Sequence, residues 1–124
     1  MKIIWSTAFV VLLLVLSITA SAQESGLVFG QADFTQGAAN RGGAVDASTL
    51  NYPLGILMDT DGGLYIADRN NHRVLYFAND GDASADRVWG QHDSLTAHIA
   101  NNNGSGNSGA PSASNLTAPS FCKR

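Results

Sequence analysis

The stretch LYIADRNNHRVLYF, residues 64–77, decides the fold, because two apolar runs flank a short group of polar residues. Leu64–Ala67 and Arg73–Phe77 are rich in β-branched, aromatic and other large apolar residues, which is typical of strands. The polar residues between them include Asp and Asn, which bond their own backbone at turns. The stretch therefore predicts a β-hairpin, and it raises the question of whether the polar turn also performs chemistry.

Three further segments resemble strands, namely Leu27–Phe29, Gly55–Met58 and Arg87–Trp89. The connections at Asp59–Gly63 and Asn79–Asp82 both contain an Asp-Gly pair, which favours a tight hairpin. No stretch after the first 22 residues has a sustained helical period. The sequence therefore predicts an all-β fold, in which three antiparallel strands form a meander and Arg87–Trp89 adds a fourth.

Both faces of the predicted meander carry apolar side chains. In Leu64–Ala67, Leu64 and Ile66 alternate with Tyr65 and Ala67, and neither pair is polar. A sheet that is apolar on both faces must be covered on both faces. Because the rest of the chain is poor in large apolar residues, we expect the meander to need neighbours for a stable fold.

An internal repeat surrounds the hairpin. VFGQAD at 28–33 resembles VWGQHD at 88–93, and LNYPLG at 50–55 shares its Leu and Pro with LTAPSF at 116–121. The two pairs follow each other in the same order and at a similar spacing. A repeat of this size that is built from strands is typical of a propeller or a solenoid array.

The segment PLGILMDTDGGLYIADRNNHRVLYF, residues 53–77, resembles the NHL repeat. The resemblance runs in order without gaps through Pro53, Gly55, Ile56, Asp59, Gly62, Leu64, Tyr65, Ile66, Ala67, Asp68, Asn71, His72, Arg73 and Val74. It implies a β-propeller in which each repeat forms one four-stranded blade. It also implies that 55–59 is the innermost strand of the blade and 87–90 the outermost.

The chain departs from the NHL pattern at its end, where Phe121 stands in place of the Gly that follows Pro-x. We therefore interpret the chain as a fragment or a short member of the family. It divides into a signal peptide helix at 1–22, a lead-in strand and loop at 23–49, an NHL-type blade at 50–91, and a loop with the truncated start of the next blade at 92–124.

The N-terminus predicts export. Lys2 precedes an apolar run that ends in Ala20-Ser21-Ala22, the small-x-small pattern of a cleaved secretory signal. An uncleaved membrane anchor is the alternative, because residues 3–22 are just long enough to span a bilayer. The expected location is secreted or extracytoplasmic, with anchoring through this segment as the alternative.

Charge and cysteine content limit the partners. The formal net charge is −3 and there is no basic stripe, so no nucleic acid partner is expected. Cys122 is the single cysteine and cannot form an internal disulfide. Gly104–Ser114 consists of small and turn-forming residues and is typical of a loop.

The polar residues of the turn admit two interpretations. Asp68 and His72 are close enough in sequence to act as an acid–base pair. However, Asp68, Asn71 and Arg73 are better explained as residues that hold the hairpin, because such side chains commonly bond the backbone at turns. We favour the structural role, so the expected structural motif comprises Pro53, Gly55, Asp59, Gly62, Tyr65, Asp68, Asn71, His72 and Arg73.

No catalytic, cofactor-binding or metal-binding residue is predicted. The acidic groups that begin at Asp59 and Asp80 lack the glycine that a calcium loop has at its sixth position. His92 and His98 have no recognised metal spacing. Asn103 and Asn115 begin acceptor sequences for N-glycosylation.

Three functional hypotheses follow. The leading one is an exported, non-enzymatic propeller protein or fragment that recognises an unknown protein or small ligand. The alternative is a piece of a secreted, metal-dependent propeller enzyme, a lyase or hydrolase. The third is a short chain that assembles blades from several copies of itself.

Overall fold

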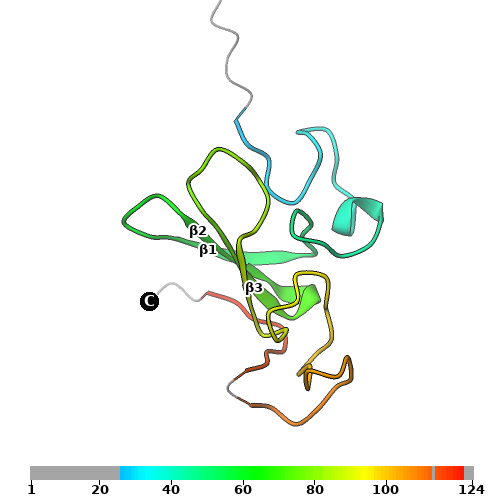
Figure 1. The fold of residues 1–124 in the computed structure, drawn as a ribbon. Coiled ribbons are helices and arrows are strands. Elements are labelled where there is room, and N and C mark those ends of the chain that lie inside the picture. The colour runs from blue at the N-terminus through cyan, green and yellow to red at the C-terminus, as the bar shows by residue number, and fades with distance from the viewer. Residues whose placement is uncertain (1–25, 113, 122–124) are drawn as a thin grey trace, which may run out of the picture.

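The computed structural model describes residues 26–112 and 114–121, and these contain one four-stranded antiparallel sheet and no α-helix. The predicted signal peptide at 1–22 and Cys122 lie outside the described residues. The strands are β1 (Pro53–Met58), β2 (Leu64–Asp68), β3 (Arg73–Phe77) and β4 (Arg87–Trp89), in the spatial order β1-β2-β3-β4 (Figure 1). Two short 3₁₀ turns accompany them, η1 (Ala39–Gly42) and η2 (Arg69–Asn71). The all-β prediction and the meander are confirmed.

The connections between strands differ in length. Between β1 and β2, Asp59 N donates to Gly63 O at 2.9 Å and Gly62 has a φ of 86°, as expected for a tight turn. The connection between β3 and β4 is a longer loop, because Asp86 N donates to Tyr76 O only after the chain has passed through Gly81. The prediction that Asn79–Asp82 forms the same kind of tight hairpin was wrong in this respect.

The predicted strand at Leu27–Phe29 was also wrong. These residues form no strand, although VFG at 28–30 resembles VWG at 88–90. The difference is that β4 pairs with β3, with Leu75 opposite Val88. Leu27–Phe29 has no comparable strand beside it in the described structure, and an extended segment without a partner leaves its backbone groups unbonded. Instead, the Phe29 ring packs edge-on against Phe77, with centroids 4.9 Å apart.

The core lies on one face of the sheet, where side chains from β2, β3 and β4 meet residues from the segments before and after the sheet. The buried cluster consists of Leu50, Ile66, Leu75, Phe77, Ala85 and Val88. Phe29, Ala47, Leu64 and Leu95 pack against it. On the opposite face, Tyr65 contacts both Tyr76 and Trp89, with ring centroids 4.8 Å and 5.6 Å away.

β1 is the exposed edge of the sheet. Ile56, Leu57 and Met58 are 64%, 57% and 66% exposed. The strand carries an irregularity between Pro53 and Ile56, where Gly55 adopts a φ of 101°. A Cβ on Gly55 would also lie 2.9 Å from the Cβ of Phe121, so this position requires glycine on both grounds.

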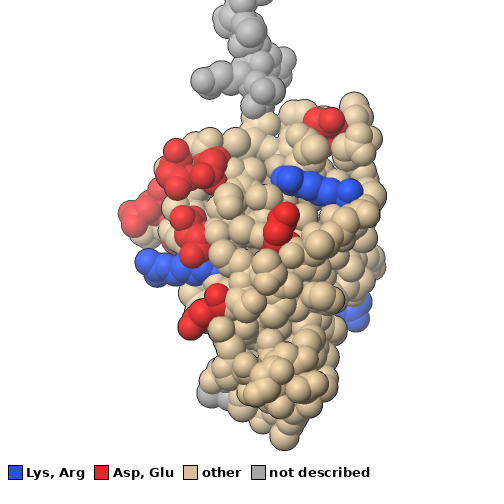
Figure 2. Space-filling view, turned by 45° about the vertical axis from the view of Figure 1, so that its right-hand side comes forward, with Lys and Arg blue, Asp and Glu red and all other residues tan. Residues whose placement is uncertain are grey.

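The predicted start of a second blade at 116–121 lies beside β1. Phe121 N donates to Leu54 O at 3.3 Å, but these residues form no strand in the described structure. No helix among the described residues is long and apolar enough to cross a membrane. Residues 94–121 contain no Asp, Glu, Lys or Arg, which agrees with the uncharged lower end of the molecule in Figure 2.

Candidate functional site

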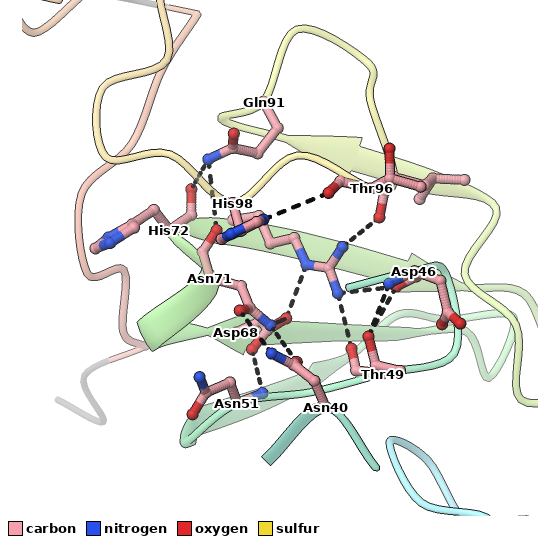
Figure 3. Close-up of polar contacts among 12 residues, drawn as sticks. Asn40, Asp46, Thr49, Asn51, Asp68, Asn71, His72, Gln91, Thr96 and His98 are labelled. Carbon is pink, nitrogen blue, oxygen red and sulfur yellow. Dashed lines mark hydrogen bonds and ion pairs between the residues drawn. The ribbon is translucent and has the colours of Figure 1, made fainter. Parts of the chain in front are cut away.

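The polar turn between β2 and β3 lies within a network of hydrogen-bonded polar side chains (Figure 3). Asp68 ends β2, Arg69–Asn71 form the 3₁₀ turn η2, and His72 adopts the left-handed conformation with a φ of 54°. β3 then begins at Arg73, whose Cα lies opposite that of Asp68 in the sheet register. The turn therefore brings two oppositely charged side chains together on the core side of the sheet.

Arg73 is fully buried and bonded on every side. Its Nε donates to Asp68 Oδ2 at 2.8 Å, and neither side chain is exposed to solvent. Its Nη2 donates to the backbone oxygens of Thr49 at 2.7 Å and Asp46 at 3.0 Å. Its Nη1 donates to the backbone oxygen of Leu95. One guanidinium thus connects the hairpin to the segment before β1 and to the segment after β4.

The Asp68 carboxylate is occupied by structural bonds. Oδ1 accepts the backbone N–H of Asn51 at 2.7 Å, and Oδ2 accepts Asn71 Nδ2 at 2.8 Å in addition to Arg73 Nε. His72 bonds elsewhere, since its Nδ1 accepts the backbone N–H of Ala118 at 3.1 Å. Asp68 and His72 therefore make separate contacts rather than forming a hydrogen-bonded acid–base pair.

A pair of asparagines extends this network. Asn71 Nδ2 donates to Asn40 Oδ1 at 2.8 Å, and Asn40 Nδ2 donates to Asn71 Oδ1 at 3.3 Å. Asn71 is buried, so this reciprocal pair satisfies polar groups that would otherwise cost free energy inside the fold. The turn is thereby tied to η1, which precedes the sheet.

The comparison with known families fits this geometry. The family model described as the NHL repeat matches residues 50–77. Comparisons with curated proteins and with solved structures find no significant match. The match begins directly after Thr49, whose backbone oxygen Arg73 binds, and ends with β3, so it contains the whole polar turn.

Gln91 lies outside the matched range, but its side chain binds the backbone of the turn within that range. It is fully buried and lies two residues after the end of β4. Its Nε2 donates to His72 O at 2.8 Å, to Ile99 O at 2.9 Å and, at 3.4 Å, to Asn71 O. Its Oε1 accepts Ile99 N and Asn102 Nδ2. Sequence reasoning noted the shared V-[FW]-G-Q pattern but missed this role, for which the repeated Gln was the available signal.

Replacing Gln91 with Ala should destabilise the closure of the NHL repeat. The change leaves the backbone oxygens of Asn71, His72 and Ile99 without their amide donor, and each buried unpaired group costs about 1–3 kcal/mol. Because water can reach part of the site once the segment loosens, we expect a loss of about 2–3 kcal/mol. Urea denaturation followed by circular dichroism measures it.

The matched control is Gln36→Ala, because Gln36 is exposed and lies in the first copy of the repeat. It should change the free energy of unfolding by less than about 0.5 kcal/mol. Equal effects of the two substitutions would contradict the role assigned to Gln91.

His72 is expected to make the stability of the fold depend on pH. Burial lowers its pKa below the usual range, the charge of His98 adds to this, and Asp68 opposes it. Protonation would also place a hydrogen on Nδ1, the atom that accepts the N–H of Ala118. The unfolded chain therefore takes up this proton at higher pH than the folded chain does.

The stability contributed by neutral His72 should be complete above about pH 6.5 and should decline as the pH falls below that value. We expect the urea concentration at the unfolding midpoint of the wild type to decrease as the pH is lowered from 8 to 5.5. His72→Gln should lose most of this dependence, whereas the control His92→Gln, at an exposed histidine that does not contribute to the His72 shift, should retain it. A pH dependence that is unchanged in His72→Gln would contradict the assignment.

The acidic loops show turn geometry. Asp59 Oδ1 accepts the backbone N–H groups of Asp61 at 3.0 Å and Gly63 at 2.8 Å, and its Oδ2 accepts Tyr76 Oη at 3.1 Å. Although partial burial acts against it, these bonds hold the pKa of Asp59 below its usual value. Among residues 26–112 and 114–121, no group of three or more His, Cys, Asp or Glu side chains converges to hold a metal ion.

The two glycosylation sequences differ in their surroundings. Asn103 is exposed, and its Oδ1 accepts the backbone N–H of Ser105 at 2.9 Å. Asn115 is buried, and its Nδ2, the atom that would carry a glycan, donates to Ala110 O at 3.1 Å. In a host that glycosylates exported proteins, we expect folded protein to carry a glycan at Asn103 and none at Asn115.

Glycosidase treatment followed by gel electrophoresis measures this difference. Asn103→Gln should abolish the mobility shift, and Asn115→Gln should leave it in place. Loss of the shift in Asn115→Gln alone would contradict the expectation.

Proposed function

We propose that the chain is an exported, non-enzymatic NHL-repeat protein that serves as a recognition scaffold for a protein or a small ligand. The observation that carries the proposal is a contrast between two parts of the blade. Asp68, Asn71 and Arg73 of the polar turn are buried and bonded to one another, whereas the apolar edge strand β1 is open to solvent.

The buried turn supports a scaffold role. Asp68, Arg73 and Gln91 are each 0% exposed, so a substrate could reach them only if the sheet opened. Each of their polar side chains bonds other parts of the same chain. Such groups define how the blade folds, and function on this kind of fold resides in surface sites.

β1 supports contact with another protein. Ile56, Leu57 and Met58 present neighbouring apolar side chains on an edge strand, where unpaired backbone groups also attract partners. Clusters of this kind are typical of interaction surfaces. We propose that further blades or a protein partner cover this strand, and that the small-residue loop at 92–115 provides a second surface for recognition.

Site-specific cross-linking tests the proposal. A photoreactive residue placed at Ile56 of the exported protein should give a defined adduct, which mass spectrometry identifies. The same residue at Ser84, which is exposed on the loop before β4, serves as the matched control. The proposal fails if Ile56 gives no adduct, or if Ser84 gives the same one.

N-terminal sequencing tests export separately. Protein recovered from the medium should begin at Gln23, after the Ala20-Ser21-Ala22 sequence. Uncleaved chain that stays in the membrane fraction would instead support the anchored alternative.

A further inference from the structure

The turn of the blade sits in a socket that we call the C-terminal socket, formed by Trp89–Gln91 and Leu116–Pro119. Gln91 Nε2 donates to His72 O at 2.8 Å, and Ala118 N donates to His72 Nδ1 at 3.1 Å. The socket thus recognises a left-handed His and the backbone oxygens beside it.

The first copy of the internal repeat builds the same socket from Phe29–Gln31 and Leu50–Pro53, which we call the N-terminal socket. A Cβ on Gly30 would lie 2.7 Å from Leu50, as a Cβ on Gly90 would lie 2.8 Å from Leu116. The two halves of each socket are therefore in equally close contact.

The backbone bonds behind the two sockets also correspond. Asn40 N donates to Leu50 O at 2.9 Å, and Asn101 N donates to Leu116 O at 3.0 Å. Tyr52 and Ala118 both have a positive φ, of 54° and 45°. The two sockets therefore share the same backbone hydrogen bond and the same left-handed position.

The N-terminal socket holds no turn in the described structure. It borders a hollow of about 380 Å³ whose lining includes Gln31, Leu50 and Tyr52. Gln31 Nε2 donates to Ala38 O at 2.8 Å, which matches the bond from Gln91 to Ile99 O at 2.9 Å. Among the described residues, Gln31 Nε2 has no further acceptor that corresponds to the two turn oxygens bound by Gln91 Nε2. Gln31 Oε1 also has no partner there, but it is an acceptor and would take a donor rather than a turn oxygen.

We propose that the N-terminal socket binds the β2–β3 turn of an NHL-type blade on a partner chain, with Gln31 donating to the backbone oxygens of an Asn-His pair. A second copy of this chain is a poor partner for the socket, because its own Gln91 already binds the oxygens of Asn71 and His72. The partner is therefore a blade whose own chain supplies no glutamine side chain to bind the backbone oxygens of its β2–β3 turn.

The same docking accounts for the missing strand at Leu27–Phe29. In the second copy, the equivalent residues form β4 because β3 lies beside them. A docked blade would bring its own third strand next to Leu27–Phe29, whose Leu27 is 48% exposed. These residues should therefore become extended and hydrogen-bonded when the socket is filled.

This inference rests on the part of the proposed function that assigns further blades to the protein, and its test is separate. The probe is a head-to-tail cyclised peptide of residues 64–77, titrated into the ¹⁵N-labelled full chain and followed by NMR. We expect shifts at the Gln31 side-chain amide and at residues 27–31, together with slowed amide exchange at 28 and 29.

Two variants and one control peptide sharpen the test. Gln31→Ala should weaken peptide binding at least tenfold, while Gln36→Ala, on an exposed glutamine nearby, should bind as the wild type does. A peptide carrying His72→Ala should bind at least tenfold more weakly.

Three results would overturn the inference. One is the absence of peptide binding, and another is equal binding to the wild type and to Gln31→Ala. The third is concentration-dependent self-association of the wild type that Gln31→Ala abolishes, because it would make a second copy the occupant. Cross-linking at Ile56 reports on β1 and can succeed or fail independently.

Discussion

Replacing Arg73 with Ala is expected to lower the free energy of unfolding by about 3–5 kcal/mol. The change leaves the Asp68 carboxylate buried without its cation, and leaves the backbone oxygens of Thr49 and Asp46 without a donor. Native domains have only about 5–15 kcal/mol of net stability, so much of the variant should be unfolded at moderate temperature. Urea or thermal denaturation followed by circular dichroism measures the loss.

Arg87→Ala is the matched control, because Arg87 begins β4 and is exposed. It should change stability by less than about 0.5 kcal/mol, despite the loss of its contact above the Tyr76 ring. Arg73→Lys should also be clearly destabilised, since one ammonium group cannot reproduce a planar fork of donors. An Arg73→Ala variant as stable as Arg87→Ala would show that the network does not hold the blade.

Phe77→Ala is expected to cost about 3–5 kcal/mol for a different reason. Phe77 is 1% exposed, ends β3, and packs edge-on against Phe29. Truncation would leave a cavity between the sheet and the segment before it, where Phe77 now contacts Phe29. The loss should therefore also release Leu27–Phe29, which amide hydrogen exchange can detect as faster exchange in that segment.

Phe34→Ala is the control for this prediction, because Phe34 is 74% exposed. Its effect should stay within about 0.5 kcal/mol. If Phe77→Ala cost no more than Phe34→Ala, the core would not be centred on the inner face of the sheet.

The sheet was predictable because its signals are local. Alternating apolar residues and Asp-Gly or Asn-rich turns specify Leu64–Asp68, Arg73–Phe77 and their hairpin without reference to the rest of the chain. Leu27–Phe29 has the same local signal but no strand, because strand formation depends on a partner that composition does not reveal. An alternating apolar pattern therefore indicates only that a segment can form a strand when another strand lies beside it.

The long-range contacts of the turn could be predicted only in part. The sequence indicated that Asp68, Asn71 and Arg73 hold the hairpin, and the structure joins all three. It gave no sign that Arg73 also binds Thr49 and Leu95, because those bonds go to backbone oxygens, which every residue has. The repeated V-[FW]-G-Q pattern was the one sequence feature that pointed to Gln91.

The polar turn of the NHL repeat joins three segments of the chain, because Asp68 and Arg73 bond the residues before β1 and after β4 as well as each other. NMR measurement of hydrogen exchange at Arg73 Nε–H tests this role most directly, because that proton lies in the buried bond to Asp68 Oδ2. We expect a resolved, slowly exchanging signal, as protected as the central amides of β2 and β3. A rapidly exchanging or solvent-averaged Arg73 Nε–H in the folded protein would contradict this role.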